Sequence, residues 1–173
     1  MMSKRYIHCM AMAGLALLVA ACVQGCKTTP KATSYTISVE VAEDVRNHSV
    51  RVDLVGVNET EKTLWETMSV SKYFRGEEAI RRSADRKTLN FVQGQSPVKI
   101  VESTDEIWDK WLNNGSLHLV VLADLPGRHE DLPGTSDTRR IILPLSRYEW
   151  DKQFLGSQPE PIRIRVDAGR IRC

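Results

Sequence analysis

Polar and apolar residues alternate strictly in several short stretches of this chain, and the alternation restricts the fold more than any other feature. In residues 35–41 (YTISVEV) every odd position is apolar and every even position is polar, and residues 49–57 (SVRVDLVGV) repeat the pattern. A period of two places successive side chains on opposite faces of a β-strand. Each stretch is therefore predicted to be a strand with one face on a core. In the second, Val50, Val52 and Leu54 should point inward, and Arg51 and Asp53 outward.

Shorter stretches add to the predicted strands, at residues 88–92, 98–101, 117–123, 139–145, 162–166 and 170–172. Residues 117–123 differ from the others, because Val120 and Leu122 make the second face apolar as well. A strand that is apolar on both faces is covered on both sides. Seven or eight short strands separated by turn signals predict a mainly all-β chain that folds as an antiparallel β-sandwich.

One or two helices are expected to interrupt the strands. Residues 103–106 (STDE) fit a capping box, Gly115 can end the helix, and an apolar stripe lies between them. The residues of that stripe are Ile107, Trp108, Trp111 and Leu112. The stripe can cover the central strand. The two tryptophans could instead form a stacking platform for sugar, and helix packing on the sheet is the interpretation favoured here.

A second helix is predicted to begin at Asn58, where Glu61 completes a similar cap. It should bury Leu64, Trp65 and Met68. No strand pattern occurs between this helix and Lys87, and the region ends in a basic cluster of Arg81, Arg82, Arg86 and Lys87. A partner's acidic surface could use that cluster. A solvated face is the simpler interpretation.

The N-terminal region has the composition of an export signal. Lys4 and Arg5 precede an uncharged run, residues 10–21, which is shorter than the roughly 20 residues that a membrane-spanning helix needs. The run ends in Val-Ala-Ala-Cys (19–22), which resembles the bacterial lipobox, in which small residues precede the cysteine that is acylated. Cys22 is therefore predicted to be the lipidation site. The alternative is an ordinary secretory signal that is cut near Ala21.

These observations divide the chain into three parts: a lipoprotein signal peptide (1–21), the lipidated cysteine with a flexible polar tether (22–34), and one β-sandwich domain (35–173). Cleavage before Cys22 removes two of the 24 basic residues and none of the 22 acidic ones, so the mature chain is close to neutral. This balance gives no electrostatic reason to expect nucleic acid as a partner.

Catalytic motifs are not found. The sequence has no nucleophile elbow, no glycine-rich phosphate loop and no histidines at metal-binding spacing, so neither an enzyme, nor a cofactor, nor a metal is predicted. Residues 124–134 (DLPGRHEDLPG) contain carboxylates around His129, but paired proline and glycine favour two exposed turns over a cation site. Cys26 and Cys173 could form a disulfide in an oxidising compartment.

The order of these features resembles a known family. The lipobox, the tether, the strands at 35–41 and 49–57, the aromatic helical segment 64–74, and the strands at 117–123, 138–142 and 162–166 look like the TssJ family, the outer-membrane lipoproteins of type VI secretion systems. The likeness extends over residues 22–172.

This resemblance implies a transthyretin-like, Ig-like sandwich with added helices, anchored in the outer membrane through acylated Cys22 and facing the periplasm. It also implies that the domain binds the periplasmic part of an inner-membrane TssM-like protein. By the same resemblance, the partner-binding loop would consist of Glu43, Asp44, Val45, Arg46, Asn47 and His48. The loop at residues 124–134 is a second candidate.

Two other interpretations stay open at this point. One is a lipid-anchored periplasmic sandwich that binds a glycan or small ligand, through Trp108 and Trp111. The other is a secreted eukaryotic glycoprotein, since Asn47, Asn58 and Asn114 lie in Asn-x-Ser/Thr sequons.

Overall fold

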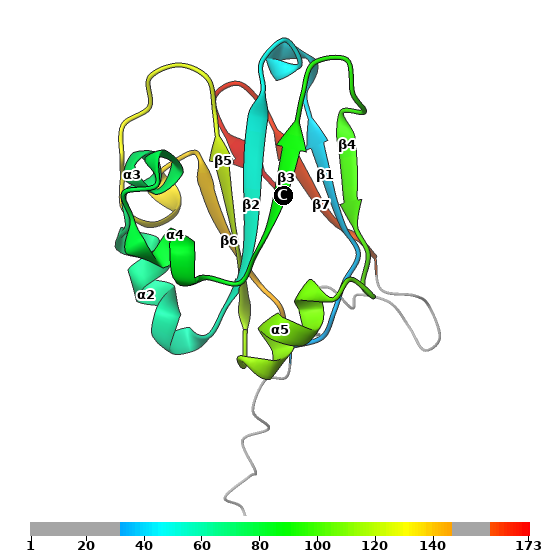
Figure 1. Cartoon of the computed structure of the whole chain (residues 1–173), viewed down its shortest axis with the longest axis vertical. Coiled ribbons are helices and arrows are strands. Elements are labelled where there is room, and N and C mark those ends of the chain that lie inside the picture. The colour runs from blue at the N-terminus through cyan, green and yellow to red at the C-terminus, as the bar shows by residue number, and fades with distance from the viewer. Residues whose placement is uncertain (1–31, 147–159) are drawn as a thin grey trace, which may run out of the picture.

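The computed structural model describes residues 32–146 and 160–173, and in them the chain forms two four-stranded sheets packed face to face (Figure 1). The strands are β1 (Ile37–Val41), β2 (Val50–Val57), β3 (Arg86–Phe91), β4 (Val98–Val101), β5 (His118–Asp124), β6 (Arg140–Pro144), β7 (Ile162–Val166) and β8 (Ile171–Arg172). The helices are α2 (Glu59–Thr67), α3 (Val70–Arg75), α4 (Ala79–Ser83) and α5 (Ile107–Asn113), with 3-10 turns η1 (Glu43–Val45) and η2 (Gly134–Ser136). No helix within these residues is long and apolar enough to cross a bilayer.

The strand order is β4-β1-β7-β8 in one sheet and β3-β2-β5-β6 in the other. Every predicted strand is present, which confirms the β-sandwich. One pairing differs from the antiparallel prediction, because β1 and β7 run parallel, with Ile37 opposite Ile162 and Val41 opposite Val166. Alternation in a sequence shows which residues face the core, but it carries no information about strand direction.

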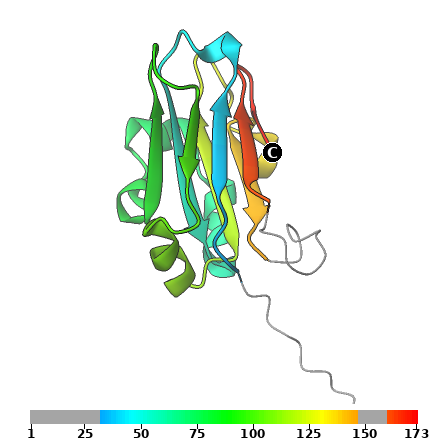
Figure 2. The same ribbon diagram turned by 90° about the vertical axis from the view of Figure 1, so that its right-hand side faces the viewer.

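The main core lies between the two sheets. The inward residues of β1, including Ile37 and Val39, are fully buried against inward residues of β2 and β5, such as Leu54 and Val121. Polar residues alternate with them on the outer face of the β4-β1-β7-β8 sheet. In Figure 2 that sheet is turned toward the viewer, and α2, α3 and α4 lie behind it.

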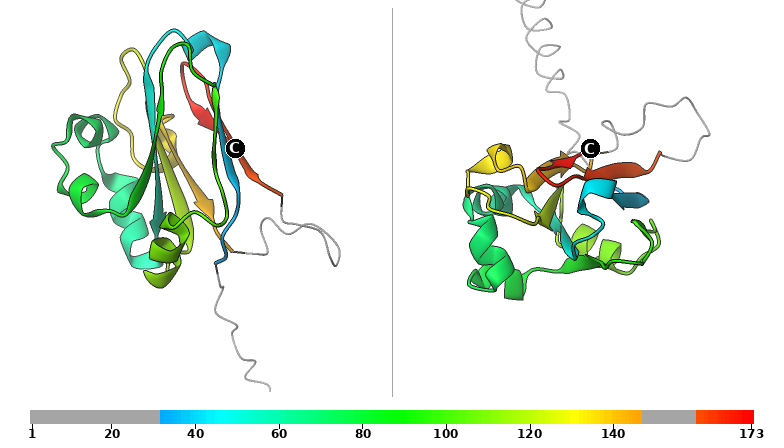
Figure 3. Two further views of the ribbon diagram at one scale, coloured as in Figure 1. Left: turned by 45° about the vertical axis from the view of Figure 1, so that its right-hand side comes forward. Right: turned by 90° about the horizontal axis from the view of Figure 1, so that it is seen from above.

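A second, smaller core lies between the outer face of the β3-β2-β5-β6 sheet and helices α2 to α4 (Figure 3). Val120 and Leu122 of β5 belong to it, whereas Leu119 and Val121 belong to the main core. The prediction that this strand is covered on both sides is thus confirmed. The expected cover was the Trp108–Trp111 helix, and this detail is wrong, because the covering side chains come from α2 and α3.

Helix α5 closes one end of the main core instead. Trp108 and Trp111 are only 2% and 1% exposed and meet edge to face, with ring centroids 5.0 Å apart. Trp111 lies directly on Gly56 of β2, where an added Cβ would be 2.3 Å from the Trp111 Cγ. Because both indoles are buried, they present no face on which a sugar could stack.

The predicted start of α5 is wrong and its predicted end is right. The helix begins at Ile107, and no capping box involving Ser103 and Glu106 forms. Asp105 accepts a hydrogen bond from the Ile107 N–H (3.1 Å) and pairs with Lys87 (2.5 Å), so Asp105 orders this turn. Gly115 follows the helix with a φ of +69°, a conformation that glycine adopts without strain.

The capping box of α2 is confirmed. The Asn58 side chain accepts from the Glu61 N–H (3.0 Å), and Glu61 Oε2 accepts from the Asn58 N–H (3.2 Å). Trp65 and Met68 are buried as predicted, but Leu64 is 55% exposed. Neighbouring residues of an α-helix point about 100° apart, so with Trp65 directed at the sheet, Leu64 is left at the side.

The basic cluster and Asp53 are less exposed than predicted. Asp53 is fully buried under α3, where it accepts hydrogen bonds from the Tyr73 hydroxyl (2.9 Å) and the Thr88 hydroxyl (2.6 Å). The Nε atoms of Arg81 and Arg86 lie 3.8 and 3.9 Å from the same carboxylate. These two arginines are therefore counter-charges of a buried acid and do not form a solvated face.

Candidate partner-binding site

The loops at one end of the sandwich form the candidate site. Ala32 pairs with Ser146 at the opposite end, and β1 runs away from it toward η1. Figure 1 shows η1, the β3–β4 turn and the start of the β5–β6 loop together at the top of the molecule. We call this group the distal end; its residues are 42–48, 92–97 and 124–128.

The η1 loop contains all six residues of the predicted partner-binding set. Glu43, Asp44, Arg46, Asn47 and His48 are exposed, whereas Val45 is fully buried in the main core. The role of Val45 is thus to hold the loop on the sandwich, and a partner could not reach its side chain without unfolding the loop.

Two hydrogen bonds fix the shape of this loop. The His48 N–H donates to the Val45 carbonyl (2.9 Å), which closes the turn. The Asp44 carboxylate accepts from the Ala168 N–H (3.1 Å), which ties η1 to the β7–β8 turn. The exposed side chains are therefore presented from a backbone that is held at both its base and its side.

Between the η1 loop and the β3–β4 turn lies a hollow with a volume of about 260 Å³. Arg46 and His48 stand on one side of it, and Phe91, Val92 and Pro97 on the other. Val92 is 47% exposed, so its side chain adds apolar surface to the hollow. A hollow that combines apolar side chains with the Arg46 guanidinium at its rim suits an apolar side chain that has a carboxylate neighbour. No sequence pattern indicated this hollow, because Phe91 and Val92 were assigned to the predicted strand 88–92.

The second candidate loop, residues 124–134, reaches the distal end only with its first half. Gly127 and Gly134 both have positive φ, which agrees with the two predicted turns. Its second half returns to α3, where Asp131 accepts from the Ser69 hydroxyl (2.6 Å) and the Ser71 N–H (2.9 Å). This acid is a structural tie, and it is not free for a partner.

Arg139 and Arg140 hold this returning segment, and the sequence did not reveal their role. Arg139 pairs with Asp137 (2.8 Å) and Asp131 (2.6 Å). Although burial acts to raise the pKa of Asp131, the hydrogen bonds from Ser69, Ser71 and Arg139 outweigh it and keep that pKa below its usual range. Arg140 is fully buried, and its guanidinium donates to the carbonyls of Trp65, Met68, Leu132 and Gly134.

The cysteine predictions fall largely outside the described residues. Cys22 and Cys26 both precede residue 32, so lipidation and the proposed disulfide stay predictions. Cys173 is exposed beside β8. Among residues 32–146 and 160–173, no cluster of three or more potential metal ligands occurs.

Comparison with known proteins gives matches at the level of structure. No protein-family model matches the sequence, and no curated protein matches it. The solved structures that resemble this chain include the C-terminal domain of the type VI secretion protein TssM from EAEC, with 14% identity and a TM-score of 0.52 over 80% of this chain and 98% of that one.

A second similar structure is the type VI secretion lipoprotein TssJ1 from Pseudomonas aeruginosa. It has 11% identity and a TM-score of 0.50, and the match covers 82% of this chain and 94% of that one. At this identity the likeness shows a common fold. The TssJ-like, transthyretin-type sandwich predicted from the sequence is thereby confirmed as the fold of the chain.

Proposed function

We propose that this chain is a structural component of a type VI secretion membrane complex. In this role Cys22, once acylated, anchors it in the outer membrane on the periplasmic side, and the sandwich binds the periplasmic part of an inner-membrane TssM-like protein. The role is one of docking and involves no catalysis.

The observation that carries the proposal is the fold that the chain shares with TssJ1 over 82% of its length. The lipobox-like sequence before Cys22 supports it independently, because it precedes the residues that form the two sheets. A sandwich of this kind hosts many functions, so the two observations are needed together.

The geometry supports an arrangement in which the distal end faces away from the membrane. The nine residues between Cys22 and Ala32 give ten Cα–Cα steps, which span at most about 35 Å, and Ala32 lies at the opposite end of the sandwich from η1. In a chain anchored through Cys22, the sandwich would then be oriented with its distal end toward the inner membrane. Confinement to a surface raises the effective concentration, so a modest interface of roughly 800 Å² per side is sufficient.

A pull-down tests the proposal. The chain without residues 1–22 is immobilised, and the periplasmic part of the TssM-like protein encoded beside it is passed over. This truncation keeps both cores, because every residue in them follows residue 31. We expect wild-type chain to retain the partner, Arg46→Glu to lose most of the binding, and Arg163→Glu, an exposed charge reversal on β7, to bind as wild type. No retention by the wild-type chain would contradict the proposal.

A further inference from the structure

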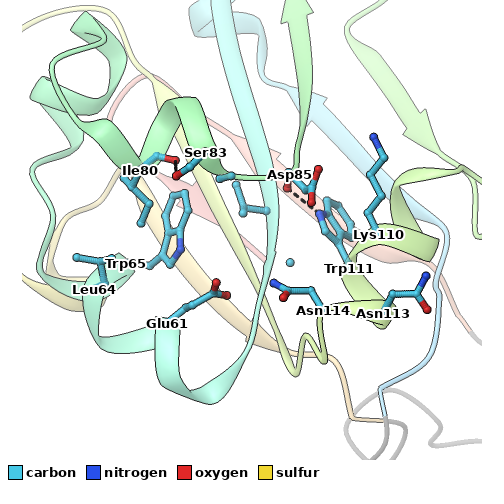
Figure 4. Close-up of a pocket in the computed structure, with 13 residues that line it drawn as sticks. Glu61, Leu64, Trp65, Ile80, Ser83, Asp85, Lys110, Trp111, Asn113 and Asn114 are labelled. Carbon is cyan, nitrogen blue, oxygen red and sulfur yellow. Dashed lines mark hydrogen bonds between the residues drawn. The ribbon is translucent and has the colours of Figure 1, made fainter.

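A cleft on the side of the sandwich lies well away from the distal end. It has a volume of about 560 Å³ and lies between α2 and α4 on one side and α5 on the other, with Val55 and Gly56 of β2 as its floor (Figure 4). The predicted partner loop and the hollow beside it contribute no residue to this cleft.

One wall of the cleft is apolar. It consists of Leu64, Trp65 and Ile80, and Leu64 at the lip is 55% exposed although the helical pattern of α2 placed it among the buried residues. The exposed leucine and the half-buried isoleucine, with the buried Trp65 behind them, give the wall an apolar surface that a second apolar group can cover.

The opposite wall and the floor carry hydrogen-bonding groups. In Figure 4 the Glu61 carboxylate and the Asn114 amide point toward one another across the floor, and the Asp85 carboxylate stands beside Trp111. Lys110 also lines the rim, but its ammonium is directed away from the centre of the cleft. Glu61 and Asp85 therefore supply acceptors, and Asn114 supplies both a donor and an acceptor.

We propose that this cleft binds a lysine or arginine side chain of an extended protein segment. The aliphatic stem of such a side chain would cover Leu64 and Ile80, and its cationic head would lie among Glu61, Asn114 and Asp85. Lysine and arginine combine an apolar stem with a charged head, which matches a cleft with one apolar wall and carboxylates at its rim. The cleft is a second binding surface of the chain, independent of the distal end and of the role assigned to it.

The cleft is held open by the core and does not depend on a ligand. Trp111 is fixed by its contact with Gly56 and by the hydrogen bond from its Nε1 to the Asp85 carbonyl (2.9 Å). Glu61 is oriented by the capping box of α2 through Oε2. A ligand therefore meets side chains that are already in place, which lowers the entropic cost of binding.

The test is an NMR titration of the ¹⁵N-labelled chain without residues 1–22, using two capped tripeptides, acetyl-Leu-Arg-Leu-amide and acetyl-Leu-Glu-Leu-amide. The arginine peptide should shift the Gly56 amide and the indole N–H signals of Trp65 and Trp111, with a Kd of about 1 mM, as expected for so small a contact. The glutamate peptide should leave these signals unchanged. Neither peptide should shift the indole N–H signal of Trp108.

Two variants and two matched controls locate the binding. Asp85→Asn and Leu64→Ala should each weaken the arginine peptide by about fivefold, since each removes one of the two kinds of contact. Asp109→Asn, an exposed acid elsewhere on α5, and Ile100→Ala, which is also 55% exposed but lies on β4, should leave the Kd unchanged. Equal shifts from both peptides, or an unchanged Kd for Asp85→Asn and Leu64→Ala, would overturn the inference. Because these four side chains are exposed, the amide spectrum of each variant should retain the wild-type dispersion.

Discussion

Replacing Gly56 by alanine tests how α5 is seated on the sandwich. The new Cβ would lie 2.3, 2.6 and 2.8 Å from the Trp111 Cγ, Cβ and Cδ1 atoms. Ordinary contacts are longer by about 1 Å, so either the indole or the β2 backbone must move. Trp111 is 1% exposed and donates to the Asp85 carbonyl, which leaves it little room.

The expected loss of stability follows from three contributions. Overpacking a filled core costs about 1–3 kcal/mol. Weakening the indole hydrogen bond adds about 1 kcal/mol. The reduced freedom of the unfolded chain on changing glycine to alanine returns about 0.4–1 kcal/mol. We expect Gly56→Ala to lower the free energy of unfolding by about 2–3 kcal/mol.

Urea unfolding followed by tryptophan fluorescence measures this change. With a slope of about 2 kcal/mol per M for a domain of this size, the midpoint should fall by roughly 1 M. Gly169→Ala is the control, because nothing lies within 4 Å of the Cβ that it would add, and its midpoint should stay near that of the wild type. A Gly56→Ala midpoint equal to that of Gly169→Ala would refute the contact between Trp111 and β2.

Three further outcomes are expected. Asp53→Ala should lower the free energy of unfolding by about 3 kcal/mol, because it leaves the Tyr73 and Thr88 hydroxyls, and Arg81 and Arg86, without their buried acceptor. The control is Glu77→Gln at the exposed pair with Arg75, which should change the urea midpoint little. The pKa of Asp131 is lowered in the folded chain, so the stability that this carboxylate contributes is complete above its ordinary pKa of 3.8 and is lost as the pH falls below that value. Asp131→Asn should therefore lose less stability than wild type between pH 5 and pH 2 in thermal unfolding, and an unchanged acid dependence would contradict this. If Cys26 and Cys173 pair in the mature protein, reduction should raise its intact mass by two hydrogens, and no change in mass would reject the disulfide.

The strands and the start of α2 were predictable because their signals are local. Alternation at residues 35–41 and 162–166 assigns the buried face of each strand whatever its neighbours are. The Asn58 and Glu61 pair forms its capping box within one turn of helix. Such features depend on short-range geometry that the sequence itself contains.

The features that were missed depend on packing between distant segments. Asp53 occupies a position that would be outward in a two-layer sandwich, and it is buried only because α3 adds a third layer over β2. The parallel pairing of β1 with β7 joins residues more than a hundred positions apart. The hollow at the distal end likewise combines the η1 loop with Val92 and Pro97 of the β3–β4 turn. No local pattern encodes these contacts, since each depends on how whole elements are arranged.

The mass of the mature protein is the most direct test of the proposed anchoring. When the protein is expressed with its full N-terminal segment in a Gram-negative host, we expect the outer-membrane fraction to contain a chain that begins at Cys22 and carries acyl groups on that residue. Cys22→Ser should abolish the modification and release the domain from the membrane. An unmodified chain in the soluble periplasmic fraction of the wild type would contradict the central claim.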